Sequence, residues 1–128
     1  MSIASNLATI EGQLSAACDR SGRDRGDVQL IAVSKTKPDE LVEEAISAGH
    51  LDFGENKVQE LIRRKGTFPE PVRWHLIGHL QKNKIRKALP CCSLVHTIDS
   101  MTLAERVNRI SEELAIRTRA LIQVNISD

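Results

Sequence analysis

The residue with the clearest chemical potential is a lysine that directly follows a short apolar segment. Lys35 comes after residues 28–34 (VQLIAVS) and alternates with Ile31 and Val33, so in an extended chain its amine shares their face. A lysine amine in a dry environment loses its proton more readily, and the neutral amine can attack an aldehyde to give a Schiff base. The alternative is a strand-end lysine that reaches out to water. Spacing alone favours this alternative.

Two further polar side chains follow apolar segments. Asn56 lies between a predicted strand at 51–54 and a predicted helix around Val58. Its side chain either caps that helix, which is the commoner role, or faces a ligand. His75 and His79 lie four residues apart on or just beyond a predicted strand at 72–78, and both point to one face if the chain stays extended. We expect His75 to be a hydrogen-bonded interior residue and His79 to lie in a loop near a pocket.

Neither a metal site nor a nucleic-acid site is expected. The two histidines lack the third ligand and the base of a zinc motif such as HExxH. A basic cluster follows the third predicted strand and could attract a phosphate or an RNA backbone, but such charges are usually the solvated face of a helix. Aromatic residues for base stacking are also scarce. The cluster consists of Lys82, Lys84, Arg86 and Lys87.

Composition narrows the class of protein. The chain has 128 residues and a net charge of +1, so no global field attracts nucleic acid or an anionic membrane. No secretory signal or long apolar span is visible, and the cytoplasm is the expected location. Its three cysteines are odd in number and have no metal-binding spacing, so we expect them to be reduced packing residues. They are Cys18, Cys91 and Cys92.

The elements that must position these side chains alternate between strand and helix. An opening helix carries apolar residues at positions 3, 7, 10 and 14 and stops at Ser21-Gly22. Pro38 is well placed to begin the next helix and Gly49 to end it. The predicted strands are 28–34, 51–54, 72–78, 94–98 and 120–126, and the helices that follow the first four contain Leu41, Leu61, Ile85 and Leu103.

This alternation predicts a parallel α/β sheet with right-handed connections. Two architectures fit five strands: an open doubly wound sheet, or part of a barrel that needs eight strands and about 250 residues. Composition does not choose between them. In both, ligands gather at the carboxyl ends of the strands, where Lys35, Asn56 and His79 are expected. The chain stops directly after the fifth predicted strand, so we expect it to be truncated relative to its fold.

Five motifs in order resemble the pyridoxal phosphate homeostasis protein family, also called the YggS/PROSC family. The match covers nearly the whole chain, and five motifs in the same order are highly specific. They are residues 32–38 (AVSKTKP), 53–60 (FGENKVQE), 74–84 (WHLIGHLQKNK), 96–100 (HTIDS) and 121–127 (LIQVNIS).

The resemblance implies the first five strands of a (β/α)8 TIM barrel of the alanine racemase N-terminal-domain type, with 1–128 as the N-terminal portion of one barrel domain. It implies that pyridoxal phosphate (PLP) is held as a Schiff base on Lys35, against the alternative that spacing favours. Asn56 matches a pocket asparagine of the family, and we expect His79 to border the ring. Family members continue well beyond this length, and in a barrel the loops after strands seven and eight typically build the phosphate site.

The implied function is PLP (vitamin B6) homeostasis by a binding protein without established turnover, with no catalytic and no metal-binding residues. Its partner is PLP itself, with PLP-dependent apoenzymes as candidate recipients, and we expect a monomer that binds neither nucleic acid nor a membrane. One alternative is a catalytic PLP enzyme of the same fold type, a racemase or a decarboxylase. Another is a nucleic-acid-binding module that uses the basic cluster.

Overall fold

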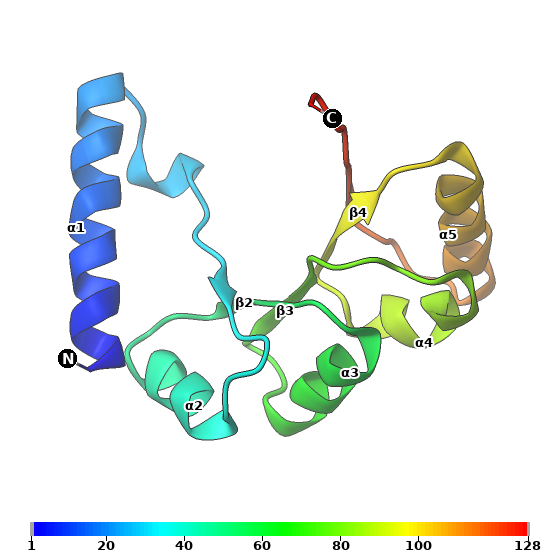
Figure 1. The fold of residues 1–128 in the computed structure, drawn as a ribbon, viewed down its shortest axis with the longest axis horizontal. Coiled ribbons are helices and arrows are strands. Elements are labelled where there is room, and N and C mark those ends of the chain that lie inside the picture. The colour runs from blue at the N-terminus through cyan, green and yellow to red at the C-terminus, as the bar shows by residue number, and fades with distance from the viewer. Residues whose placement is uncertain (1, 128) are drawn as a thin grey trace. The chain divides into compact units, whose positions relative to one another are not determined.

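The structure is a computed structural model that describes residues 2–127. The chain divides into two compact units. The first unit comprises the segments before Ala32 and Thr36–Leu51, and the second comprises Ala32–Lys35 together with the chain from Asp52 onward. Figure 1 shows the order of the elements along the chain.

The first unit is helical. It contains α1 (Ile3–Ser21), a short 3-10 helix η1 (Arg25–Asp27) and α2 (Asp39–Ser47). The predicted opening helix is confirmed as α1, and it ends as predicted, since Gly22 follows Ser21 in the left-handed conformation with φ of 72°. Pro38 precedes α2 as its N-cap, and Gly49 follows it with φ of 94°, as the sequence predicts.

The second unit is built on a sheet of five parallel strands in the order β1-β2-β3-β4-β5. The strands are β1 (Ala32–Val33), β2 (Asp52–Glu55), β3 (Arg73–Leu76), β4 (Leu94–Ile98) and β5 (Ala120–Ile122). The connections hold α3 (Val58–Thr67), then η2 (Lys82–Lys84), α4 (Ile85–Ala88) and η3 (Leu89–Cys91), and finally α5 (Met101–Glu113).

The strand order decides between the two architectures. A doubly wound sheet reverses direction at a switch point, whereas a barrel adds each new strand on the same side of the previous one. Here each strand pairs with the next one along the chain, and no reversal occurs. The described part of the chain therefore has the winding of a (β/α) barrel, and the predicted fold class is confirmed.

The two faces of the sheet differ in character. Phe53 of β2 pairs in register with Trp74 of β3, and their rings stack at 5.2 Å between centroids. On the same face Leu76 pairs with Val95 of β4, and all four side chains are buried. Helices α3, α4 and α5 lie along one side of the strands in Figure 1. The opposite face is the one that a closed barrel would turn inward.

Four predicted elements differ in length from those observed, and one of them is the third strand, which is predicted at 72–78 and spans Arg73–Leu76. The first strand is only two residues long and pairs with β2, and its Val33 is 51% exposed. The predicted basic helix is divided into η2, α4 and η3, with Pro90 in the first turn of η3. The fifth strand ends at Ile122, and only the backbone amide of Gln123 continues the pairing, to Ile98. Among the described residues no helix is long and apolar enough to cross a membrane.

Candidate functional site

Lys35 lies at the carboxyl end of β1, where the sequence places it. The preceding Ser34 is buried, and its backbone amide donates to the carbonyl of Gly54 at 3.1 Å, which fixes the strand end on β2. Lys35 itself is exposed. Thr36 follows with φ of 65°, a left-handed conformation that a β-branched residue rarely adopts. Lys35 therefore lies between Ser34, whose backbone is hydrogen-bonded to β2, and Thr36, whose backbone is strained.

Asn56 and His79 line one cavity of about 330 Å³ at the carboxyl ends of β2 and β3. Gln81 and Lys84 line it as well, so the wall combines an amide, an imidazole and a cation. The sequence brings these side chains together through two successive loops. His79 is a loop residue beside this cavity, as predicted.

The commoner role considered for Asn56, capping of the next helix, is wrong. Helix α3 begins at Val58, its N-cap is Lys57, and no side chain caps it. Asn56 lies one residue too early for its amide to reach the first-turn donors in the usual way. Asn56 instead lines the cavity.

Lys35 is not among the lining residues of that cavity. The strand register nevertheless places Lys35 and the cavity at the same level of the sheet. Val33 pairs with Gly54, Lys35 comes two residues after Val33, and Asn56 comes two residues after Gly54. Neighbouring parallel strands lie about 4.8 Å apart. The chain thus leaves the sheet at the same level in both places, with Lys35 and Asn56 following adjacent strands.

A glycine holds the loop of Asn56 against the end of β3. An added Cβ on Gly78 would lie 2.0 Å from the backbone oxygen of Asn56 and 2.8 Å from its side-chain Oδ1. The carbonyl of Gly78 accepts a hydrogen bond from Thr97 Oγ1 at 2.8 Å, which ties the same turn to β4. Gly78 therefore allows two neighbouring loops to meet closely.

His75 is a buried, hydrogen-bonded residue, as predicted, and it lies on the face opposite to Trp74. Its Nε2 is 3.0 Å from Asp52 Oδ1, and its Nδ1 is 3.0 Å from Nε2 of His96. Arg73 donates two hydrogen bonds of 2.7 Å to the same carboxylate, and this raises the pKa of Arg73. The arrangement is satisfied when neutral His75 donates to Asp52 and accepts from His96. His79 lies beyond the end of β3, so the two histidines do not share a strand face.

The pair of histidines predicts a pH dependence of stability. Burial lowers the pKa of His96 below its ordinary value of 6.5, and neighbouring His75 lowers it further. The folded protein thus binds this proton less tightly than the unfolded chain does. Folding is therefore favoured when His96 is neutral. This stabilisation of the folded protein is complete above about pH 6.5 and is lost as the pH falls through the lowered pKa of His96. We expect the urea midpoint of wild type to fall as the pH is lowered below about 6.5, and we expect a smaller fall for His96→Leu.

The control for this prediction is His79→Asn, which removes an exposed histidine and should keep the wild-type slope. Equal slopes for wild type and His96→Leu would show that the histidine pair does not cause the dependence.

A buried polar cluster that was not predicted from the sequence lies next to Lys35 and consists of Ser34, Glu55 and Arg64. Ser34 Oγ donates to Glu55 Oε2 at 2.5 Å, and Arg64 Nε lies 3.5 Å from the same oxygen. The side chains of Glu55 and Arg64 are each only 2% exposed. One signal was available, because Arg64 continues the spacing of the buried residues Val58 and Leu61 in α3. A cation in such a stripe requires a buried acceptor.

The basic cluster and the cysteines have ordinary surroundings. Arg86 forms an ion pair with Glu113 of α5, and Lys84 faces the cavity of Asn56. The three cysteines are free, and burial raises the pKa of Cys92 to about 12, so it is a poor nucleophile at neutral pH. Within residues 2–127 no three acidic, histidine or cysteine side chains are grouped as a metal site.

Comparison with known proteins identifies relatives of the whole chain, although no family model matches it. It is 43% identical over 130 residues to the pyridoxal phosphate homeostasis protein of Escherichia coli, covering 98% of this chain and 56% of that protein. The bovine protein of the same name is 39% identical over 133 residues, covering 94% and 48%. The chain therefore spans about half the length of the curated relatives it matches.

Solved structures agree in fold. PipY of Synechococcus elongatus, determined without PLP, superposes with a TM-score of 0.85 at 40% identity, covering 98% of this chain and 55% of that one. The same protein with PLP bound gives a TM-score of 0.82 at 41% identity over the same shares. The sequence, the order of the strands and these likenesses agree, and the chain belongs to the pyridoxal phosphate homeostasis protein family, of which it represents about the N-terminal half.

Proposed function

We propose that this chain supplies the lysine side of a PLP site, and that Lys35 holds the cofactor as a Schiff base. The observation that carries the proposal is the position of an exposed lysine at the carboxyl end of β1. Ligands of parallel barrels bind at this end of the strands. The relative with PLP bound, which has the same fold and 41% identity, supports the choice of ligand.

The residues present fit such a group. The cavity of Asn56 and His79 has about 330 Å³, within the usual range of roughly 300–1,000 Å³ for small-molecule sites. Its amide and imidazole can hydrogen-bond polar groups of an aromatic ring, and Lys84 brings a positive charge that suits an anionic ligand. Asn56 and His79 are therefore proposed to border the ring, with Lys35 reaching it from the neighbouring strand.

The chemistry asked of Lys35 is simple. Its ammonium gives up a proton, Nζ attacks the aldehyde carbon, and a carbon–nitrogen double bond forms as one water leaves. When bound, PLP supplies an electron sink for carbanions of amino acids. Ser34 and the strained turn at Thr36 hold the lysine backbone at the strand end, so only the side chain has to move.

We further propose that the complete protein is one barrel domain that maintains the PLP pool in the cytoplasm without catalytic turnover. Its relatives are named for PLP homeostasis rather than for a reaction. PLP-dependent apoenzymes are the proposed recipients, and a monomer is the proposed state.

Retention of PLP tests this proposal. The chain is mixed with PLP and dialysed, and bound cofactor is measured by absorbance beside Lys35→Ala. We expect loss of retained cofactor in Lys35→Ala but not in Lys37→Ala, a control two residues further along. Equal retention by wild type and Lys35→Ala would refute the role of Lys35. Lys35-dependent turnover of amino acids would favour a racemase or decarboxylase instead.

A further inference from the structure

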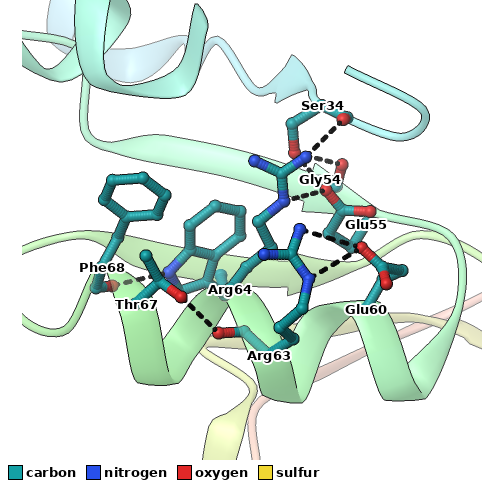
Figure 2. Close-up of polar contacts among 9 residues, drawn as sticks. Ser34, Gly54, Glu55, Glu60, Arg63, Arg64, Thr67 and Phe68 are labelled. Atoms are coloured by element: carbon teal, nitrogen blue, oxygen red, sulfur yellow. Dashed lines mark hydrogen bonds and ion pairs between the residues drawn. The ribbon is translucent and has the colours of Figure 1, made fainter. Parts of the chain in front are cut away.

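A buried ion pair joins Arg64 of α3 to Glu55 at the end of β2, and Arg64 also contacts Ser34, the residue before Lys35. Figure 2 shows Arg64 reaching from the helix towards Ser34 and Glu55. One guanidinium nitrogen, Nε, lies 3.5 Å from Glu55 Oε2, and another lies 3.5 Å from the backbone carbonyl of Ser34. The fork of one arginine thus spans two neighbouring strands.

Ser34 is held at three points. Its hydroxyl donates to Glu55 Oε2 at 2.5 Å and is 3.3 Å from the carbonyl of Gly54, and its amide donates to that carbonyl at 3.1 Å. Its carbonyl, which begins the peptide bond to Lys35, is the group that Arg64 contacts. Since Lys35 is the next residue, its backbone position depends on these contacts.

The conformation just beyond Lys35 needs such support. Thr36 has φ of 65°, where a β-branched residue is strained. Strained backbone persists only where its surroundings fix it, and it occurs most often at functional sites. The chain beside Thr36 is fixed by the contacts to Ser34, since β1 has a ladder of only two residues.

Stability alone is a weak reason for this ion pair. Two buried charges lose their hydration, and replacing both by apolar side chains of similar size is often neutral or stabilising. The pair with 2% exposure on both sides is therefore expected to contribute little to net stability. What it provides is a fixed geometry, because the planar fork of arginine can contact a carboxylate and a carbonyl at once.

We propose that Arg64 and Glu55 are positioning residues that hold Ser34, and through it Lys35, in the orientation needed to react with an aldehyde. This inference rests on the proposed role of Lys35 in binding PLP. Arg64 and Glu55 touch neither the cofactor nor the reacting atoms in this account. Their effect is on the fraction of chains in which the lysine is correctly placed, and apparent affinity falls in proportion to that fraction.

The decisive variant is the double substitution Glu55→Met/Arg64→Met, which removes both charges and leaves neither one buried alone. A neighbouring pair offers a matched control, since Glu60 and Arg63 lie on the same helix, 3.1 Å apart and more than 40% exposed. Figure 2 shows this pair beside the buried one. The control variant is Glu60→Gln/Arg63→Gln.

Three readouts separate positioning from folding. Thermal unfolding reports whether each variant is folded. Borohydride trapping over a series of PLP concentrations reports the fraction of Lys35 that carries cofactor. Hydrogen exchange without PLP reports local opening of residues 33–37 and needs no bound ligand.

We expect the double variant to unfold within a few degrees of wild type, to need about tenfold more PLP for half-maximal trapping, and to exchange faster at 33–37. The control should match wild type in all three. If the double variant does not fold, Ser34→Ala carries the test, because it removes the hydroxyl contacts to Glu55 Oε2 and to the carbonyl of Gly54 and leaves both charged side chains in place. Weaker trapping by folded Ser34→Ala then supports the inference, and unchanged trapping overturns it.

The two proposals fail in different ways. If wild type is trapped at Lys35 and the folded double variant is trapped equally well with the same exchange, the positioning role is overturned and the role of Lys35 stands. If wild type itself is never trapped at Lys35, the role of Lys35 is refuted and the positioning role with it.

Discussion

Trp74→Ala is expected to lower the free energy of unfolding by about 3–5 kcal/mol, the range for removing a large aromatic side chain from a core. Trp74 is fully buried and stacks on Phe53, and its ring centroid lies 6.4 Å from that of Phe68. Its Nε1 also donates to the carbonyl of Phe68 at 2.9 Å. The substitution removes an aromatic contact, leaves a cavity under α3 and deprives a buried carbonyl of its donor.

Urea unfolding followed by circular dichroism measures this loss, since the chain has no other tryptophan to report by fluorescence. Met101→Ala is the control, because Met101 is 73% exposed and its truncation should change stability by no more than about 0.5 kcal/mol. A loss below about 1 kcal/mol for Trp74→Ala would contradict the core described for β2, β3 and α3.

Gly78→Ala is the second large effect, and it should change both stability and the site. The new Cβ would meet the backbone oxygen of Asn56 at 2.0 Å, closer than any ordinary contact, so one of the two loops must move. Overpacking of this kind costs about 1–3 kcal/mol, occasionally more. Asn56 lines the cavity, so its displacement should also weaken retention of PLP.

A glycine on the neighbouring helix provides the opposite expectation. Gly66 lies near the end of α3, and nothing lies within 4 Å of an added Cβ there. Gly66→Ala should therefore be neutral or stabilise the protein by up to about 1 kcal/mol, because alanine is the better helix former. Urea midpoints that fall equally for the two variants would refute a specific contact at Gly78.

The sequence predicted the order of elements because periodicity is a local signal. Strand 94–98 is found at those residues, and α1 ends at the predicted glycine. The strand 28–34 was predicted too long, because its apolar residues are also compatible with an irregular approach to the sheet and only Ala32 and Val33 pair with β2. Pairing depends on neighbours that a single segment does not reveal.

The site was predictable in part, because the ends of strands are also a local signal. Lys35, Asn56 and His79 follow strands, and strand ends can be read from the sequence. The choice of PLP came from the family motifs and not from spacing, which favoured an unreactive lysine. The contact of Arg64 with Ser34 joins residues thirty positions apart, so only the folded chain reveals it.

The proposed attachment of PLP to Lys35 is tested most directly by locating the modified residue. The chain is incubated with PLP and reduced with borohydride, which adds hydride to the carbon of the carbon–nitrogen double bond and leaves a stable secondary amine. Digestion and mass spectrometry then locate the modified lysine. We predict modification confined to Lys35 and absent from Lys35→Ala. Modification that is spread over Lys37, Lys82 and other exposed lysines, or that persists unchanged in Lys35→Ala, would contradict the account.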